Sequence, residues 1–333
     1  MVLVTGGTGF LGAHLLDQLV QAGEQVRCLY RTKPFKYVPQ DIIKQIEWVQ
    51  GDLLDTVSLD KAMQGVQQVY HCAGKISFQP KDKERLNQVN VVGTANIVNC
   101  SLEHGIQKLL YVSSVAALGS AKDNELVTEK CKWEVKRNNT VYGKSKHLAE
   151  LEIWRGIAEG LPAIIVNPST LIGPSLYWSE GSPSLFKNIA EGFAYYPIGL
   201  NGFADVRDTA RLIRHLMRTN ISEERFIINN ENWTFKRLFL SIKDQFNLET
   251  KFIEINPFVS NILCQAAKIK ALFTGTEPLI TKEMAITSAE KVSYSNRKIA
   301  GLFPSFQWTS LEETIADTCH VFLEQKTTSG QED

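Results

Sequence analysis

Short apolar runs alternate with amphipathic stretches along the first half of the chain. Several runs, such as Val2–Thr5, are apolar without alternation, which is typical of parallel strands covered on both faces. The stretches between them place apolar residues at helical spacing. We expect strands at Val2–Thr5, Gln25–Tyr30, Ile46–Gln50, Gln68–His71, Lys108–Ser113 and Ala163–Asn167, and helices at Phe10–Ala22, Lys83–His104 and Val141–Glu159. This rhythm predicts an α/β fold, a doubly wound parallel sheet with helices on both faces.

The rhythm breaks after Pro168, where glycine and proline punctuate a loop-rich, aromatic stretch. A helix at Val206–Arg218 and a strand at Arg225–Asn230 return the chain to the sheet. The remaining segments are mainly helical: Trp233–Phe246, Pro257–Leu272, Thr281–Ala289 and Ser310–Glu324. We therefore predict a sheet domain from residues 1–168 and 203–230, a smaller, mainly helical lobe from 169–202 and 231–326, and a polar tail at 327–333.

Composition narrows the range of partners. Lys+Arg and Asp+Glu both number 36, so bulk charge gives no support for a nucleic-acid partner. No apolar run reaches the roughly 18 residues that span a bilayer. The six cysteines form no CxxC pair and the N-terminus lacks a secretory pattern, so we expect reduced thiols and a cytoplasmic location. The six histidines show no metal-ligand spacing, and we expect no metal.

A glycine-rich turn follows the first strand directly and opens the first helix. Gly6, Gly9 and Gly12 recur at three-residue intervals, and Gly7, Gly9 and Gly12 also fit GxGxxG. In this context glycines allow a tight turn and close approach of a pyrophosphate to a helix N-terminus. The pattern predicts a Rossmann-type dinucleotide site, with contacts from Gly6, Thr8, Gly9, Phe10, Leu11 and Gly12.

The end of the second strand bears on which dinucleotide binds. An NAD-selective turn usually places an acid there for the ribose hydroxyls, but this strand ends Leu29-Tyr30-Arg31-Thr32-Lys33. Arg31 suits a 2′-phosphate, with Lys33 assisting. We favour NADP and keep NAD as the alternative.

Tyr142 and Lys146 stand four residues apart, on one face of a predicted helix. This helix follows a strand that ends in Ser113 and Ser114. Because ligands in open α/β sheets bind at the carboxyl ends of the strands, the position predicts a catalytic Ser–Tyr–Lys site.

Taken with the turn, these motifs resemble the extended short-chain dehydrogenase/reductase superfamily, the NAD-dependent epimerase/dehydratase group. They cover roughly the first two-thirds of the chain in the order that such a fold presents them. The matching elements are TGGTGFLG (Thr5–Gly12), GDLLD (Gly51–Asp55), HCAG (His71–Gly74), VNVVGT (Val89–Thr94), SSVAALG (Ser113–Gly119), YGKSK (Tyr142–Lys146), NPSTLIGP (Asn167–Pro174) and FADVRDTA (Phe203–Ala210).

The resemblance implies roles for residues along the cleft. It makes Ser114 the catalytic serine, five residues before Gly119, with Ser113 as the fallback, and gives Asn90 a mainly structural role. A homodimer through the helices at Lys83–His104 and Val141–Glu159 is also implied. The implied cofactor contacts are Asp52 and Leu53 at the adenine, Cys72, Ala73, Gly74 and Val112 along the cleft, Pro168 and Ser169 at the nicotinamide, and Tyr142 and Lys146 themselves.

The implied chemistry is hydride transfer between the nicotinamide and a hydroxyl or carbonyl carbon of a small-molecule substrate. Tyr142 would exchange a proton with the substrate oxygen, and Ser114 would donate a hydrogen bond to it. An ammonium at Lys146 would favour the phenolate, since a free tyrosine has a pKa near 10. Lys146 would also bond the nicotinamide ribose.

Three functions compete. Asn167-Pro168-Ser169 resembles the dihydroflavonol-reductase and 3β-hydroxysteroid-dehydrogenase branch, which favours a reductase acting on a hydrophobic or aromatic substrate. Apolar residues expected over the nicotinamide agree, although several could belong to the core of the lobe: Ile76, Phe78, Leu118, Leu171, Leu176, Tyr177, Trp178, Phe186, Phe193, Tyr195 and Tyr196.

A sugar-nucleotide epimerase is the second function. Against it, Ser113-Ser114-Val115 lacks the Thr-Asp-Glu run of a dehydratase, and Asn201 stands where an arginine often binds the diphosphate. Arg207, Arg211 and Arg214 lie close by, on what we expect to be a solvated helix face. The third alternative is a non-catalytic NADP(H)-binding regulatory protein, which commonly loses the Tyr or the Lys. An amphipathic helix over Pro257–Thr276 could cap the pocket, form a dimer surface or lie on a membrane, and we expect a cap.

Overall fold

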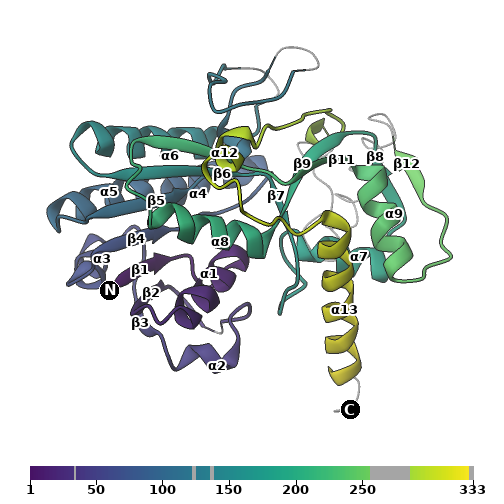
Figure 1. Ribbon diagram of the computed structural model, residues 1–333, viewed down its shortest axis with the longest axis horizontal. Helices are drawn as coiled ribbons and strands as arrows, with labels where there is room; N and C mark the ends of the chain where they lie inside the picture. Colours follow the sequence, from purple (N-terminus) through teal and green to yellow (C-terminus); the bar gives the residue numbers. More distant parts are fainter. Residues whose placement is uncertain (34, 122–124, 136–138, 256–285, 330–333) are drawn as a thin grey trace.

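The computed structural model describes residues 1–33, 35–121, 125–135, 139–255 and 286–329 (Figure 1). A seven-stranded parallel sheet in the order β10-β6-β5-β4-β1-β2-β3 forms its centre. This arrangement confirms the predicted fold class. The strands are β1 (Val2–Thr5), β2 (Val26–Tyr30), β3 (Glu47–Gln50), β4 (Gln68–His71), β5 (Lys108–Val112), β6 (Ala163–Pro168) and β10 (Glu224–Ile228).

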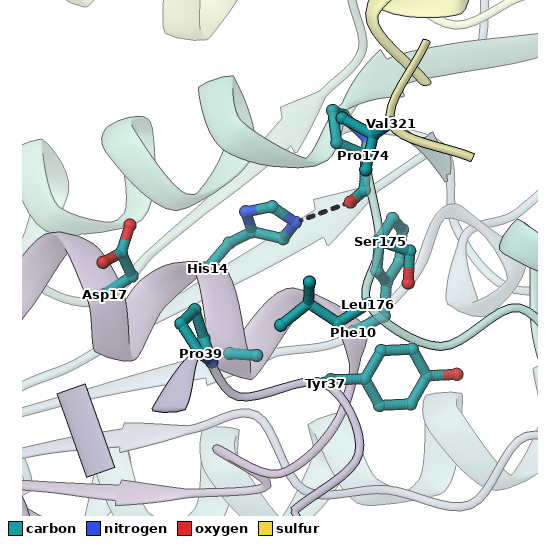
Figure 2. Close-up of a pocket in the computed structure, with 10 residues that line it drawn as sticks. Phe10, His14, Asp17, Tyr37, Pro39, Pro174, Ser175, Leu176 and Val321 are labelled. Carbon is teal, nitrogen blue, oxygen red and sulfur yellow. Dashed lines mark hydrogen bonds between the residues drawn. The ribbon is translucent and has the colours of Figure 1, made fainter. Parts of the chain in front are cut away.

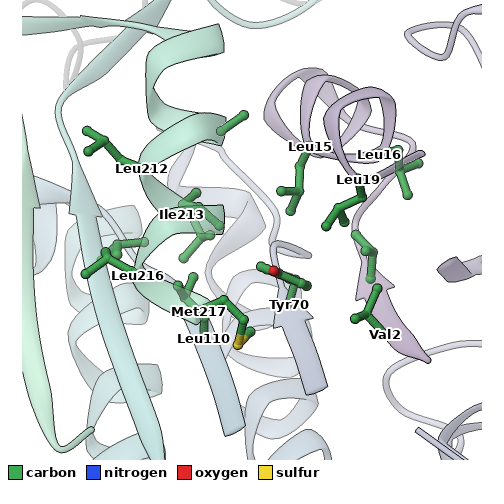
Figure 3. Packing of buried hydrophobic residues seen from close by; sticks show 14 of the residues in the cluster. Val2, Leu15, Leu16, Leu19, Tyr70, Leu110, Leu212, Ile213, Leu216 and Met217 are labelled. Atoms are coloured by element: carbon green, nitrogen blue, oxygen red, sulfur yellow. The ribbon is translucent and has the colours of Figure 1, made fainter. Parts of the chain in front are cut away.

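Two apolar layers enclose this sheet. On one face, α1 (Phe10–Gln21) and α8 (Val206–Met217) pack side by side, and Leu15, Leu216 and Tyr70 lie in one buried cluster (Figure 3). On the other face the covering helices are α3 (Thr56–Met63), α5 (Gly93–Glu103) and α6 (Val141–Ala158). Because both faces are covered, strands such as β1 and β5 are buried throughout, as their unbroken apolar runs predict.

The helix expected over Lys83–His104 consists of three parts. It begins as α4 (Lys83–Leu86), continues as a π-helical segment, η2 (Asn87–Val92), and ends as α5. Val92 and Leu151, on the helices expected to form a dimer, are exposed in the single chain. The homodimer itself stays a prediction.

A second group of elements packs beside the carboxyl end of the sheet. Its buried cluster joins aromatic and aliphatic side chains, including Phe186, Phe203, Trp233 and Ile315. Its elements are β7 (Thr170–Ile172), α7 (Pro183–Ala190), β8 (Tyr195–Pro197), β9 (Leu200–Asp205), β11 (Glu231–Thr234), α9 (Phe235–Gln245), β12 (Ile253–Ile255) and α13 (Leu311–Ser329), with β11-β9-β7 and β12-β8 as small sheets. Within the predicted lobe segment 231–326, α12 (Arg297–Leu302) instead lies against β10, and Ile299 joins the α1–α8 cluster.

Several boundaries differ from those expected. The helix expected from Trp233 begins at Phe235, because Trp233 pairs with Asn201 in the β11–β9 ladder. The helix expected to end at Glu324 continues to Ser329, and Thr327 and Thr328 donate hydrogen bonds to carbonyls one turn earlier. The helix expected over Pro257–Thr276 lies outside the described residues, as does most of the one expected over Thr281–Ala289.

Further short elements connect the layers: α2 (Gln40–Ile43) and the 3-10 turns η1 (Pro80–Asp82) and η3 (Val115–Ala117). None of the described helices is both long enough and apolar enough to cross a bilayer. The cysteines in the described part of the chain, Cys28, Cys72, Cys100, Cys131 and Cys319, are free thiols.

Candidate functional site

The turn between β1 and α1 tolerates no side chain at two of its glycines. Gly6 has a φ of +72°, and a Cβ there would lie 2.4 Å from the backbone nitrogen of Ala73. A Cβ on Gly12 would lie 2.1 Å from the carbonyl oxygen of Gly6. Glycine is therefore required at both positions so that the turn, the helix and the end of β4 can approach one another.

The same turn leaves an open, positive helix end. Gly9 precedes α1 in an extended conformation, and a Cβ on it would meet only the Gly6 carbonyl, at 3.4 Å. The first turn of α1 carries no acidic residue, and Thr8, Phe10 and Leu11 are partly exposed. Unpaired N–H groups at a helix N-terminus favour an anion, so this end of α1 suits a diphosphate.

The residues expected to border the adenosine follow β2 and β3. Arg31 and Lys33 are exposed in the loop after β2, and the Lys33 ammonium lies 5.8 Å from the ring centroids of Tyr30 and Phe35. After β3, the Asp52 carboxylate accepts a hydrogen bond from the Leu54 nitrogen at 3.0 Å. Leu53 is nearly buried beside Gly93 of α5. These residues therefore lie at neighbouring strand ends, and their contact with the adenosine stays a prediction.

The wall after β4 continues from the glycine turn. The Cys72 nitrogen donates to the Thr5 carbonyl at 3.0 Å, and burial raises the pKa of its thiol to about 12. A Cβ on Gly74 would stand 3.4 Å from both the Asn90 side-chain oxygen and the Lys146 nitrogen. Ala73, which stands between Cys72 and Gly74 in the chain, lies against Gly6. This segment thus connects the turn to the region of Lys146.

A buried polar chain that we did not predict lies beneath this wall. The His71 ring is within hydrogen-bond distance of the Thr5 hydroxyl, at 2.7 Å, and of the Thr94 hydroxyl, at 3.0 Å. Thr94 in turn donates to the Asn90 carbonyl at 2.6 Å. Complete burial lowers the pKa of His71 to about 3, so its ring is neutral. The sequence pattern marks His71 only as part of a strand, because its hydrogen-bond partners come from distant segments.

Asn90 fixes the loop after β4 to α6. Its side-chain oxygen accepts from the Lys75 nitrogen at 2.7 Å, and its amide donates to the Lys75 carbonyl at 3.0 Å and to the Ser145 hydroxyl at 2.9 Å. Ser145 donates to the Tyr142 carbonyl at 2.8 Å. Asn90 thus joins the cleft wall to the helix that carries Tyr142.

Ser114 and Tyr142 meet at the carboxyl end of β5. Tyr142 lies in the first turn of α6, where Thr140 caps the helix by accepting from the Gly143 nitrogen. The neighbouring Ser114 hydroxyl lowers the pKa of the Tyr142 phenol, whereas burial, the larger effect, raises it to about 12. Ser114 is half-buried and Ser113 is buried. Of the two serines, Ser114 is the one that acts on Tyr142, and its catalytic role stays a prediction.

Lys146 lies one turn after Tyr142 and is almost fully buried. Its ammonium donates to the Tyr111 hydroxyl at 2.9 Å and to the Val112 carbonyl at 2.8 Å, both in β5. Burial lowers its pKa to about 8, and the negative charge of Glu150 opposes that effect. Because an ammonium has three donors, one remains for a ligand.

The strand β6 ends beside these groups. The Ser169 nitrogen donates to the Ile228 carbonyl at 2.9 Å, while its buried hydroxyl has no hydrogen-bond partner among the described residues. Such a buried group is unusual without a partner. The Ser169 hydroxyl, after Pro168, is therefore available to a bound molecule at the position expected for the nicotinamide.

The chain matches the family model described as "NAD dependent epimerase/dehydratase family" over residues 2–229. This range includes the glycine turn, Ser114, Tyr142 and Lys146.

The chain belongs to the NAD dependent epimerase/dehydratase family.

The proteins that this chain resembles in sequence include some that are named as reductases. The chain is 32% identical to a protein named "Putative dihydroflavonol 4-reductase" from Synechocystis sp., over 96% of this chain and 93% of that one. It is 30% identical to sterol demethylase protein B of Methylococcus capsulatus, over 71% of each. Among solved structures, gox2253 superimposes with a TM-score of 0.80 at 27% identity, covering 98% of each chain.

Sugar-nucleotide enzymes share the fold. UDP-glucose 4-epimerase of Thermotoga maritima superimposes with a TM-score of 0.78 at 17% identity, covering 98% of this chain and 99% of that one. At that identity the likeness shows the fold alone. Family membership makes the chain an NAD(P)-dependent oxidoreductase of the extended short-chain type. Its glycine cradle, its uncharged helix start and the Ser169 hydroxyl fit a nicotinamide dinucleotide.

Several apolar residues expected over the nicotinamide lie elsewhere. Trp178, Phe186 and Tyr196 are buried in the core of the second lobe. Tyr177 contacts the loop after β2, where Lys36 donates to its hydroxyl at 3.1 Å. Of the expected set, Phe78 lies beside the catalytic candidates, with its ring 5.8 Å from that of Tyr142. The apolar lining is therefore smaller than the sequence suggested.

Arg207 and Arg211 of α8 are engaged in ion pairs, and the Arg214 Nε is buried without a hydrogen-bond partner among the described residues, so the three do not form the solvated face that we expected. Arg207 pairs with Asp205 at 2.6 Å and with Asp317 at 2.7 Å, and Arg211 pairs with Asp208. Asn201 donates to the Thr170 hydroxyl at 3.0 Å. Asn201, Arg207 and Arg211, which the sequence offered for the diphosphate of a sugar nucleotide, therefore already have partners.

A hollow of about 160 Å³ lies on the flank of α1 (Figure 2), and Tyr142 is not among the residues that line it. His14, Tyr37, Leu176 and Val321 line it, and the His14 ring donates to the Pro174 carbonyl at 3.0 Å. Of the predicted site residues it includes Phe10. Among the described residues, no group of three His, Cys, Asp or Glu side chains is placed to hold a metal ion.

Proposed function

We propose that the protein is an NADP(H)-dependent reductase that acts on the carbonyl of a small, hydrophobic or aromatic substrate. The grouping of Ser114 and Tyr142 at the carboxyl end of β5, with the buried Lys146 one turn along α6, carries the proposal. The reductase names among the relatives and the Phe78 ring beside Tyr142 support it.

The residues of the chain have separate tasks in this reaction. The bound dinucleotide would supply the hydride. Ser114 donates a hydrogen bond that holds the substrate oxygen beside the Tyr142 hydroxyl. Tyr142, protonated at neutral pH because burial raises its pKa to about 12, donates its proton to that oxygen as the alcohol forms. The Lys146 ammonium stabilises the phenolate that remains until a proton returns.

The loop after β2 supports NADP as the favoured cofactor. No acidic residue stands directly at the end of β2, and the Arg31 guanidinium has no ion-pair partner in the described part of the chain. A free guanidinium suits bidentate binding of a 2′-phosphate. Lys36, in the same loop, is instead held by Tyr177. Arg31 is therefore the group that we propose for the 2′-phosphate, with Lys33 beside it.

Turnover with NADPH and a panel of aromatic aldehydes, hydrophobic ketones and dihydroflavonols tests the reaction. We expect Tyr142→Phe to lower kcat by at least about 10²-fold, the usual contribution of a positioned proton donor, while NADPH binding is kept. Tyr70→Phe is the matched control, because it removes a hydroxyl from the core on the other face of the sheet. Equal activity of wild type and Tyr142→Phe would refute the assignment.

Fluorescence titration with NADPH and NADH tests the cofactor. We expect Arg31→Ala to weaken NADPH binding by about tenfold or more, equivalent to about 1.4 kcal/mol, and to leave NADH binding unchanged. Lys36→Ala removes a charge from the same loop and should change both affinities alike, since Lys36 binds Tyr177. Tighter binding of NADH than of NADPH by the wild type would contradict the NADP assignment.

A further inference from the structure

A buried carboxylate follows Lys146 by one turn of α6. Glu150 has no exposed surface, and one of its oxygens accepts from the Asn167 amide at 2.6 Å. The other oxygen pairs with the Arg225 guanidinium, which reaches it from β10. Because both partners are donors, Glu150 binds them as an ionised carboxylate, although burial raises its pKa.

Asn167 extends this contact to the catalytic serine candidate. The same Asn167 amide that donates to Glu150 also donates to the Ser114 carbonyl at 2.8 Å. Asn167 stands at the end of β6, immediately before Pro168. Glu150 therefore connects β6, β10 and the segment after β5 to the helix that carries Tyr142 and Lys146.

The charge of Glu150 also acts on Lys146. The two residues are i and i+4 on α6, so their side chains lie on the same face. Burial lowers the pKa of Lys146 to about 8, and among the charges around it Glu150 contributes the main opposing effect. Arg225 in turn lowers the pKa of Glu150 and so favours its ionised form.

We propose that Glu150 is a positioning residue of the reductase site: it fixes Ser114 through Asn167 and keeps the buried Lys146 positively charged. This role rests on the proposed function, but the two effects on Ser114 and Lys146 are properties of the folded chain itself. Tyr142, two turns before Glu150 on the same helix, receives both effects indirectly.

The charged and titratable groups around the pair come from several elements. Arg225 of β10 faces Glu150, and its guanidinium lies 5.7 Å from the Trp154 ring. His147 lies between Lys146 and Glu150 in sequence, and burial and Arg225 lower its pKa. Tyr111 of β5 accepts from Lys146, and Cys72 raises the pKa of Lys146 against the effect of burial. Of these, Arg225 and Glu150 carry the charges that the experiment changes.

Titration of Lys146 by NMR tests the proposal without any substrate. The full chain is labelled with [ε-¹³C]lysine, and the Lys146 signal is identified by its loss in Lys146→Arg. We expect Glu150→Gln, which keeps the hydrogen bond to Asn167, to lower the pKa of Lys146 by about one unit or more. Arg225→Gln, which removes the cation that lowers the pKa of Glu150, should lower the pKa of Lys146 by a smaller amount, and the double variant should match Glu150→Gln. Glu152→Gln, on the exposed side of α6 where Glu152 pairs with Arg155, should leave it unchanged.

Activity supplies the second measurement. If NADPH-dependent turnover is found, Glu150→Gln should lower kcat more than it changes the KM for NADPH and should move the alkaline limb of the reduction profile to lower pH. An unchanged pKa of Lys146 in both Glu150→Gln and Arg225→Gln would overturn the proposal, even if both variants were less stable. Absence of Tyr142-dependent turnover in the wild type would instead count against the proposed function, and the NMR titration would still decide the effect on Lys146.

Discussion

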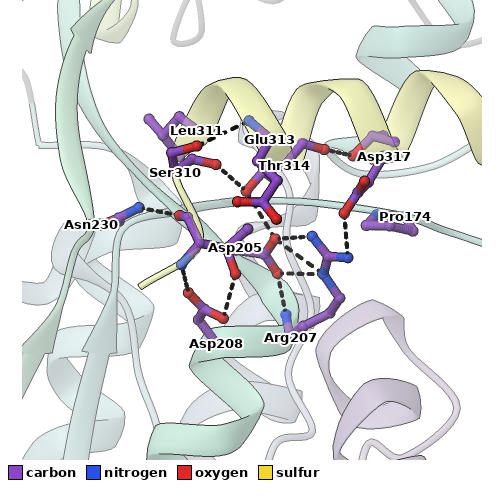
Figure 4. Close-up of polar contacts among 12 residues, drawn as sticks. Pro174, Asp205, Arg207, Asp208, Asn230, Ser310, Leu311, Glu313, Thr314 and Asp317 are labelled. Carbon is purple, nitrogen blue, oxygen red and sulfur yellow. Dashed lines mark hydrogen bonds and ion pairs between the residues drawn. The ribbon is translucent and has the colours of Figure 1, made fainter. Parts of the chain in front are cut away.

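Asp205 offers the sharpest test of how the second lobe is attached to the sheet domain. Its carboxylate has no exposed surface and caps α8 by accepting from the Arg207 nitrogen at 2.6 Å. It also pairs with the Arg207 guanidinium and accepts from the Thr314 hydroxyl of α13 at 2.9 Å (Figure 4). Asp205→Ala removes all of these contacts at once.

The magnitude follows from these contacts. Loss of an N-cap costs about 1 kcal/mol, and loss of one partner of a buried ion pair costs about 3–5 kcal/mol. Because the Arg207 side chain is 31% exposed and keeps Asp317, we take the lower end of the second range. We expect Asp205→Ala to reduce the free energy of unfolding by about 4 kcal/mol. Asp205→Asn, which keeps a capping oxygen, should cost about half as much.

Urea denaturation at pH 7, followed by tryptophan fluorescence, measures these changes. Asp317→Ala is the control, because it removes the outer partner of Arg207, whose side chain is 43% exposed. We expect that variant to lose at most about 1 kcal/mol, as surface ion pairs do. A loss below about 1 kcal/mol for Asp205→Ala, or equal losses for Asp205→Ala and Asp317→Ala, would refute the reasoning.

Three further predictions concern the sheet domain. Gly12→Ala should weaken dinucleotide binding about tenfold or more in a fluorescence titration, because its Cβ would lie 2.1 Å from the Gly6 carbonyl oxygen. Gly301→Ala is the control, because Gly301 has open space around it, and this variant should bind the dinucleotide as the wild type does. The pKa of His71 in the folded state, about 3, lies below its ordinary 6.5, so His71 contributes stability that is lost as pH falls from about 6.5 towards 3, by about 1.4 kcal/mol per pH unit. The free energies of unfolding of wild type and His71→Asn, compared between pH 6.5 and 5, should differ by this slope. Parallel curves for the two proteins would contradict the prediction. Leu216→Ala, in the fully buried α1–α8 cluster, should cost about 2–5 kcal/mol in urea denaturation, and a loss under 1 kcal/mol would mean that the cluster repacks.

The sheet domain was predictable because its signals are local. Each strand such as β1 is a short apolar run, and the glycine turn and α1 follow it without interruption. The π-helical segment at Asn87–Val92 was not predicted, because the contacts that accompany it are made with distant parts of the chain and leave no local pattern. There Asn90 bonds Lys75 and Ser145, which are distant in sequence.

The second lobe shows the opposite case. Asn201-Gly202 is a typical turn dipeptide, yet it lies inside β9, which pairs with β11 and β7. Glycine is needed there because a Cβ would lie 2.2 Å from the Asn229 side-chain oxygen. Short strands stabilised by partners thirty residues away carry no local signature, so the loop that we expected over this region contains several small strands.

The candidate site divides in the same way. Tyr142 and Lys146 could be predicted because one helix carries both at helical spacing. Glu150 continues that spacing, but only its contacts with Asn167 and Arg225, on two other elements, distinguish it from a surface acid. The apolar residues after β6 could not be sorted from the sequence, because core and pocket linings have the same composition.

The charges of the site bear on the direction of the proposed reaction. Burial raises the pKa of Tyr142 to about 12 and lowers that of Lys146 to about 8, so at pH 7 the phenol holds its proton and the lysine is charged. A protonated phenol beside a cation is a proton donor, which carbonyl reduction requires, whereas alcohol oxidation requires the phenolate. The cation persists in a buried site because Glu150, held by Arg225, lies one turn away. The same buried carboxylate that fixes Ser114 therefore also favours reduction at neutral pH.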